Sequence, residues 1–110
     1  MPTIQSEDEF YQAIEQEVPT LVVFGIVGER WTDVTMKFFG LQEVQVSFVP
    51  WDDGVDLRLS LELQRYPVAQ LWQRGRLLTE QVGYHRGRLQ LLADQYFKTK
   101  RGFHGKGKGT

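Results

Sequence analysis

The most constraining feature of this sequence is a nearly continuous apolar run from Leu21 to Ile26, rich in β-branched residues. Pro19 precedes the run and Gly28 follows it. A run of this length without polar alternation is typical of a strand covered on both faces. With 110 residues, 41% of them hydrophobic, the chain is long enough for one domain with a packed core. The run therefore predicts the central strand of a sheet that lies between helices.

Helical patterns lie on both sides of this strand. Ser6 and Glu9 have the spacing of a capping box, which predicts a helix from about Glu7 to Gln16. Apolar residues at helical spacing from Trp31 to Phe39 predict a second helix, and a terminal amphipathic helix is expected from about Gly87 to Phe97.

Further strands are predicted in the second half of the chain. Val44 to Val49 reads as a strand closed by Pro50. The alternating leucines from Leu57 to Leu63 fit a strand, but they also form i, i+4 pairs, so periodicity leaves helix and strand open. Residues 68–73 and 77–84, joined by a tight turn, predict a β-hairpin.

Charge and cysteine content limit the possible functions. The chain has no cysteine, which excludes disulfides, thiolate metal sites and dithiol redox chemistry. The net charge of −1 conceals a basic end, because the five positive residues after Phe97 are accompanied by no acid and residues 1–97 carry −6. We expect a folded domain over residues 1–97 and a flexible, basic, Gly/Lys-rich tail over residues 98–110.

No catalytic or metal-binding motif stands out. His85 and His104 are the only histidines, and Asp52 with Asp53 reads as a solvated turn. Gly102 to Lys108 comes near a phosphate-binding loop but lacks the Ser or Thr that would ligate magnesium. We therefore expect no enzyme, no cofactor and no metal. No apolar run is long enough to cross a membrane and the first residues do not resemble an export signal, so a cytoplasmic protein without a membrane partner is expected.

The order of elements resembles the thioredoxin fold. Thr20-Leu21-Val22-Val23-Phe24 resembles the central strand of that family, and residues 48–53 resemble the next strand with its acidic turn. Tyr66-Pro67-Val68 resembles the cis-proline segment, and Arg74-Gly75 with Gln81-Val82-Gly83 resembles the closing hairpin. The resemblance covers about residues 3–97. It implies an α/β three-layer sandwich with a mixed sheet of four to five strands flanked by helices.

The departures from the family are equally informative. Glu29 and Thr32 occupy the positions of the two cysteines, and neither side chain can exchange a disulfide. The buried acid of the family is replaced by Val23, and Val68 replaces the threonine that usually follows the cis-proline. The resemblance therefore implies a scaffold that has lost its redox chemistry.

In the family, the cysteine loop, the cis-proline loop and the loop before the last helix form an apolar patch that docks partner segments. The resemblance carries this patch to a protein-binding surface made of Trp31, Tyr66, Pro67, Val68, Gly83 and Tyr84. Aromatic side chains are frequent interface anchors. The alternative is that Trp31 caps the second helix while the two tyrosines are half-buried with solvated hydroxyls.

The basic tail suggests a second kind of contact. It could bind nucleic acid or an acidic protein weakly through its basic residues Lys98, Lys100, Arg101, Lys106 and Lys108. The alternative is that the tail acts only as a solubilising extension. We expect a non-catalytic protein-binding module, acting as an assembly, chaperone-like or structural subunit of a larger complex. The alternatives are an accessory factor of a nucleic-acid-handling complex that uses the tail, and a residual enzyme that uses Glu29.

Overall fold

The computed structural model describes residues 3–40 and 44–84. Within these ranges it contains three helices and four strands, in the order α1 (Glu7–Ile14), β1 (Thr20–Gly25), α2 (Arg30–Gly40), β2 (Gln45–Pro50), α3 (Val55–Ser60), β3 (Val68–Gln73) and β4 (Arg76–Val82). The predicted terminal helix over 87–97 and the predicted domain boundary after residue 97 lie outside the described residues.

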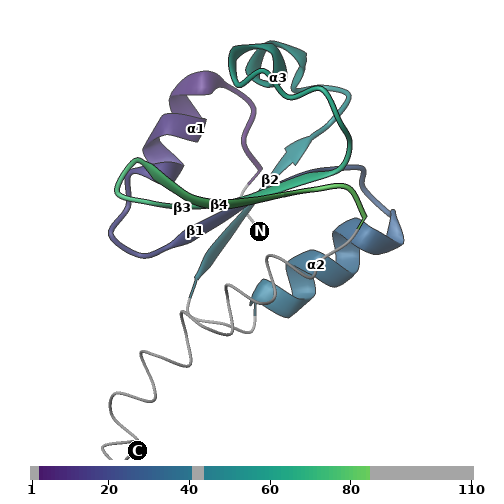
Figure 1. The fold of residues 1–110 in the computed structure, drawn as a ribbon, viewed down its shortest axis with the longest axis horizontal. Helices are drawn as coiled ribbons and strands as arrows, with labels where there is room; N and C mark the ends of the chain where they lie inside the picture. Colours follow the sequence, from purple (N-terminus) through teal and green to yellow (C-terminus); the bar gives the residue numbers. More distant parts are fainter. Residues whose placement is uncertain (1–2, 41–43, 85–110) are drawn as a thin grey trace, which may run out of the picture.

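The four strands form one mixed sheet with the order β2-β1-β3-β4. β1 runs parallel to β2 and antiparallel to β3, and β3 and β4 form the predicted hairpin. All six residues of β1 are buried, as expected for a central strand. Figure 1 shows the sheet nearly edge-on, with α1 and α3 on one side and α2 on the other. The predicted three-layer α/β architecture is therefore confirmed.

Alternate residues of β1 point into two separate cores, because successive side chains of a strand face opposite sides of the sheet. Leu21 and Val23 belong to the core on the α2 side, together with Trp31. Val22 and Phe24 belong to the core on the α1 and α3 side. The central strand thus holds both layers of helices to the sheet.

α1 begins and ends through contacts that its sequence partly predicts. The Oγ atom of Ser6 accepts a hydrogen bond from the backbone N–H of Glu9 at 3.2 Å, as in a capping box. The Glu9 carboxylate, however, accepts from the backbone N–H of Gln5 at 2.6 Å instead of that of Ser6. The helix ends at Ile14, two residues earlier than expected, and the carbonyl of Ile14 accepts from the backbone N–H of Gly75 in the β3–β4 turn at 2.8 Å.

The leucine segment whose periodicity left two choices contains α3 and no strand. Leu57 is buried against the core that contains Phe10, and Leu61, one helical turn later, is partly buried against the same core. Leu59 is exposed. The i, i+4 pairing of Leu57 with Leu61 therefore determines the structure here, because it places both side chains on the same side of the segment.

No helix within the described residues is long and apolar enough to span a lipid bilayer.

Replacing Phe10 by Ala should lower the free energy of unfolding by about 3–5 kcal/mol, the usual cost of removing a buried aromatic ring. Phe10 is fully buried and packs edge-to-face on Trp72, with ring centroids 5.6 Å apart. The neighbouring Tyr11→Ala is the control, because Tyr11 is exposed and should cost less than half as much. Urea unfolding measures both variants, and equal costs would contradict this description of the core.

Candidate functional site

Three segments that are distant in the sequence meet at one end of the sheet. Phe24, the next-to-last residue of β1, pairs with Val68 at the start of β3, and Val68 pairs with Val82 at the end of β4. The loop after β1, the segment before β3 and the residues after β4 therefore lie side by side. The Tyr66-Pro67 peptide bond is cis, as the sequence resemblance implies. The carbonyl of Pro67 accepts a hydrogen bond from the N–H of Gly83 at 2.7 Å.

Glu29 joins these three segments through its side chain. One carboxylate oxygen accepts a hydrogen bond from the hydroxyl of Tyr66, and the other lies 3.4 Å from the hydroxyl of Tyr84, which donates to it. We call Glu29, Tyr66 and Tyr84 the Glu29 cluster. Glu29 and Tyr66 are partly exposed, and Tyr84 is 57% exposed. The residue at the first cysteine position of the resembled family is thus hydrogen-bonded to both the cis-proline segment and the loop after β4.

Both phenols hold their protons more tightly than an ordinary tyrosine. Desolvation by burial, followed by the hydrogen bond to Glu29, raises the pKa of Tyr66 well above its usual range, while the Thr32 hydroxyl acts in the opposite direction. Desolvation and the charge of Glu29 also raise the pKa of Tyr84. At neutral pH both residues are therefore neutral hydrogen-bond donors.

The cluster continues into a row of aromatic rings. The ring centroid of Tyr66 lies 5.0 Å from that of Trp51 and 6.1 Å from that of Tyr84, and both contacts are edge-to-face. The guanidinium of Arg58 lies 4.3 Å from the ring centroid of Trp51, and its Nε donates to the Trp51 carbonyl at 2.7 Å. This end of the domain therefore carries a row of aromatic rings in contact with one another, and one of them already binds a cation.

Thr32, at the second cysteine position, has a structural role. Its side chain is buried, and its Oγ1 atom accepts a hydrogen bond from the backbone N–H of Ile26 at 3.3 Å. A Cβ atom at Gly25 would lie only 2.3 Å from that oxygen, so β1 and α2 approach each other closely here. Thr32 thus fixes the loop that carries Glu29, without reaching the surface itself.

Of the residues in the predicted binding surface, Trp31 lies in the core. Its side chain is only 7% exposed and packs in the core on the α2 side, because the first turn of α2 lies over the sheet. Pro67 and Val68 are buried as well. Trp31 is therefore a core residue and offers little area to a partner, whereas Tyr66, Gly83 and Tyr84 reach the surface.

Two exposed apolar residues in the loop between β1 and α2 were not predicted as part of the binding surface. Ile26 is 40% exposed and Val27 is 80% exposed. The apolar run predicts a strand through Ile26, but β1 ends at Gly25, so the last two apolar residues fall in the loop that leads to Glu29. No sequence signal identifies them, because an apolar residue in the loop after a strand looks the same in the sequence as one inside the strand. We call Ile26, Val27 and the Glu29 cluster the candidate binding face.

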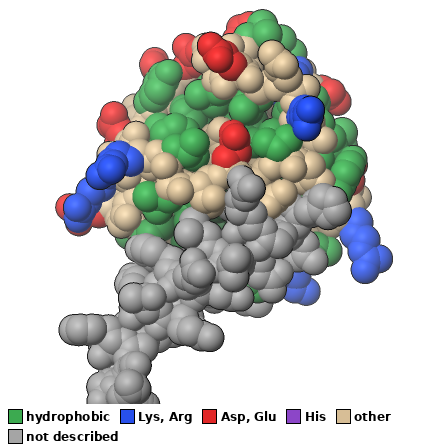
Figure 2. Space-filling model, in the orientation of Figure 1, with side chains coloured by type: hydrophobic (Ala, Val, Ile, Leu, Met, Phe, Trp, Pro, Cys, Tyr) green, Lys and Arg blue, Asp and Glu red, His purple; other side chains and the backbone are tan. Residues whose placement is uncertain are grey.

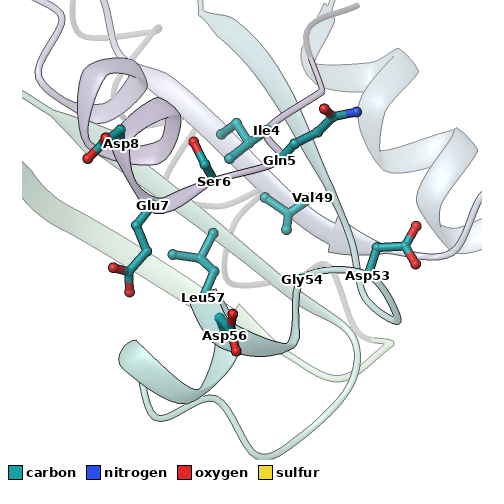
Figure 3. Close-up of a pocket in the computed structure, with 10 residues that line it drawn as sticks. All are labelled: Ile4, Gln5, Ser6, Glu7, Asp8, Val49, Asp53, Gly54, Asp56 and Leu57. Atoms are coloured by element: carbon teal, nitrogen blue, oxygen red, sulfur yellow. The ribbon is translucent and has the colours of Figure 1, made fainter.

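A pocket lies elsewhere on the domain and shares no lining residue with the candidate binding face. It is an open pocket of about 590 Å³ between the start of α1 and the start of α3 (Figure 3). Four carboxylates line it, on Glu7, Asp8, Asp53 and Asp56. Among the described residues, however, no group of three or more His, Cys, Asp or Glu side chains could hold a metal ion.

On the face drawn in Figure 2, hydrophobic side chains lie in several separate groups, and most acidic and basic side chains lie toward the edges of the face. The residues proposed to bind a polyanion, Lys98, Lys100, Arg101, Lys106 and Lys108, lie outside the described residues, as do His85 and His104.

Comparisons with solved structures agree with this architecture. The thioredoxin of Plasmodium falciparum superposes with a TM-score of 0.70 at 16% identity, covering 87% of this chain and 99% of that one. Thioredoxins of Trypanosoma brucei brucei and Malassezia sympodialis give TM-scores of 0.69 and 0.72 at 18% and 16% identity, over 86% of this chain and 88% and 90% of theirs. The fold is thioredoxin-like. No protein-family model and no curated protein sequence matches the chain.

At 16–18% sequence identity, the similarity to these thioredoxins shows the fold alone. The structure places Glu29 beside the cis-proline, where the resemblance assigned a cysteine position. Because the chain contains no cysteine, these residues cannot carry out the dithiol exchange of a thioredoxin.

Replacing Tyr66 by Phe tests the central hydrogen bond of the cluster. The variant should lose about 1 kcal/mol of unfolding free energy at neutral pH, the usual net contribution of such a bond at a partly exposed site. Folding raises the pKa of Tyr66. The contribution of this residue to the free energy of unfolding is therefore complete below the pKa of an unfolded tyrosine, and it is lost as the pH rises above about 10.

When the pH rises from about 9 to about 11, the free energy of unfolding should therefore fall less in Tyr66→Phe than in the natural chain. Denaturant unfolding across this range measures the difference, with Tyr11→Phe as the control that removes an exposed phenol elsewhere. Parallel pH profiles for Tyr66→Phe and the natural chain would contradict the proposed hydrogen bond.

Proposed function

We propose that this chain is a redox-silent thioredoxin-like protein-binding module, acting as an assembly, chaperone-like or structural subunit of a larger complex. One observation carries the proposal. Without any cysteine, the loops that surround the cis-proline are still held together, through the hydrogen bonds of Glu29 to Tyr66 and Tyr84. An ordered surface that has no redox role is most simply a surface for binding.

The composition of the candidate binding face supports this function. Val27 is 80% exposed, and Tyr84, which is hydrogen-bonded to Glu29 in the loop that carries Val27, is 57% exposed. Desolvating such groups is the main driving force of protein association, and tyrosine is enriched among residues that dominate binding energy. The edge-to-face contacts of Tyr66 restrict the rings before a partner arrives, which lowers the entropic cost of association.

A catalytic role for Glu29 is less well supported. Its two hydrogen-bond partners are phenols whose pKa values are raised, so neither is a nucleophile at neutral pH. We therefore propose a non-enzymatic, redox-inactive member of the thioredoxin-like group. A cytoplasmic location stays a prediction from the sequence.

The alternative function, an accessory factor that contacts nucleic acid through the tail, depends on the five basic residues after Phe97. The two functions differ in their response to salt. Binding through the tail should weaken steeply between low and moderate salt, because phosphate contacts release counterions. Binding through an apolar face should persist, because burial of apolar surface is not screened.

Affinity capture from the natural source tests the proposed function. The natural chain should retain a defined partner at high salt, and Val27→Asp should reduce the recovered partner at least tenfold, because a buried carboxylate without a counter-ion opposes association. Val18→Asp is the matched control: Val18 is also an exposed valine, but it precedes β1 and lies at the opposite end of the sheet.

Circular dichroism should show both variants folded. Equal partner recovery with Val27→Asp and the natural chain would contradict the proposed face. Loss of the partner only when Lys98, Lys100, Arg101, Lys106 and Lys108 are all replaced by Gln would favour the alternative function.

A further inference from the structure

The Glu29 cluster has an unbalanced charge at its centre. Glu29 supplies one carboxylate, and its two hydrogen-bond partners are phenols that keep their protons, so they leave its negative charge in place. No ion pair to Glu29 is formed by the residues within 3–40 and 44–84. Each carboxylate oxygen has two lone pairs and receives one hydrogen bond from a tyrosine, so capacity remains for further donors.

The surrounding rings favour a planar cation. The rings of Tyr66 and Tyr84 stand almost perpendicular, at 80°, with centroids 6.1 Å apart, and aromatic faces attract cations. The same aromatic row already holds a guanidinium, because Arg58 lies over Trp51. Trp51 at one end of the row thus has a bound cation, whereas exposed Tyr84 at the other end has none among the described residues.

The distribution of charge along the chain favours the same ligand. Residues 1–97 carry a net charge of −6, so a positively charged segment is attracted before it makes contact. Ile26 and Val27 are exposed and lie in the same tight turn as Glu29, because the carbonyl of Ile26 accepts a hydrogen bond from the backbone N–H of Glu29 at 3.0 Å. A ligand at the carboxylate therefore has exposed apolar side chains in the same turn.

We propose that the Glu29 cluster is a receptor for an arginine side chain, presented by an extended segment of the partner whose apolar residues cover Ile26 and Val27. This inference rests on the proposed function and specifies the partner's chemistry. The guanidinium donates to the free lone pairs of Glu29 and stacks on the exposed ring of Tyr84. Arginine fits better than lysine, because its planar fork can do both at once, whereas an ammonium is a compact, strongly hydrated charge.

A pair of synthetic peptides tests the inference. The probe is the blocked pentapeptide acetyl-Ala-Leu-Arg-Leu-Ala-amide, and its partner has citrulline, which has nearly the same shape but no charge, in place of arginine. Titration into the ¹⁵N-labelled full chain should shift the amide signals of Glu29, Tyr66 and Tyr84 with saturation. The arginine peptide should bind about fivefold more tightly than the citrulline peptide, as expected for a cation between a carboxylate and an aromatic face.

In the Glu29→Gln variant, the arginine peptide should bind no more tightly than the citrulline peptide. Glu17→Gln, which removes the same charge from an exposed residue before β1, should preserve the difference between the peptides. A preference for arginine that survives Glu29→Gln would overturn the inference.

The remaining outcomes separate this inference from the proposed function. Equal binding of both peptides at these amides would overturn the arginine receptor and leave the binding face intact. Absence of shifts at these amides from either peptide would count against both. In the chain without peptide, Arg101→Gln should leave the amide signals of Glu29, Tyr66 and Tyr84 unchanged. A shift of these signals would indicate that the chain's own tail occupies the cluster, and it would overturn the assignment to a partner.

Discussion

A single carboxylate connects the parts of this domain that its sequence separates. Glu29 accepts hydrogen bonds from Tyr66, 37 residues later, and from Tyr84, 55 residues later. Because each phenol keeps its proton and Glu29 supplies the acceptors, the three side chains fix the loops around the cis-proline relative to one another. In the resembled family a dithiol stands at this place. Here a hydrogen-bonded carboxylate, which cannot exchange a disulfide, takes the position.

The cluster depends in turn on the central strand. β1 is buried on both faces, and its pairing with β3 brings the loop that carries Glu29 beside the cis-proline. Thr32 then fixes that loop, because its side chain accepts a hydrogen bond from the backbone N–H of Ile26. The apolar core thus sets the position of a polar cluster, and the hydrogen bond to Glu29 orders the exposed side chain of Tyr84.

The fold was largely predictable from the sequence, because its strongest signals are local: the apolar run of β1, the Ser6 cap and the hairpin turn. The leucines from Leu57 were ambiguous, since two periodicities coincide and only packing against Phe10 distinguishes them. The site was less predictable. Exposure of a residue such as Trp31 depends on how α2 lies on the sheet, and the bonds from Glu29 to both tyrosines join residues that no sequence period relates.

The most direct test of the account is site-specific photo-cross-linking in the organism of origin, with benzoyl-phenylalanine introduced at Val27 or at Val18. Both valines are exposed, but they lie at opposite ends of the sheet. A discrete cross-linked partner is expected from position 27 and none from position 18. A partner cross-linked from position 18 but not from position 27 would contradict the claim that the loops around the cis-proline form the binding face.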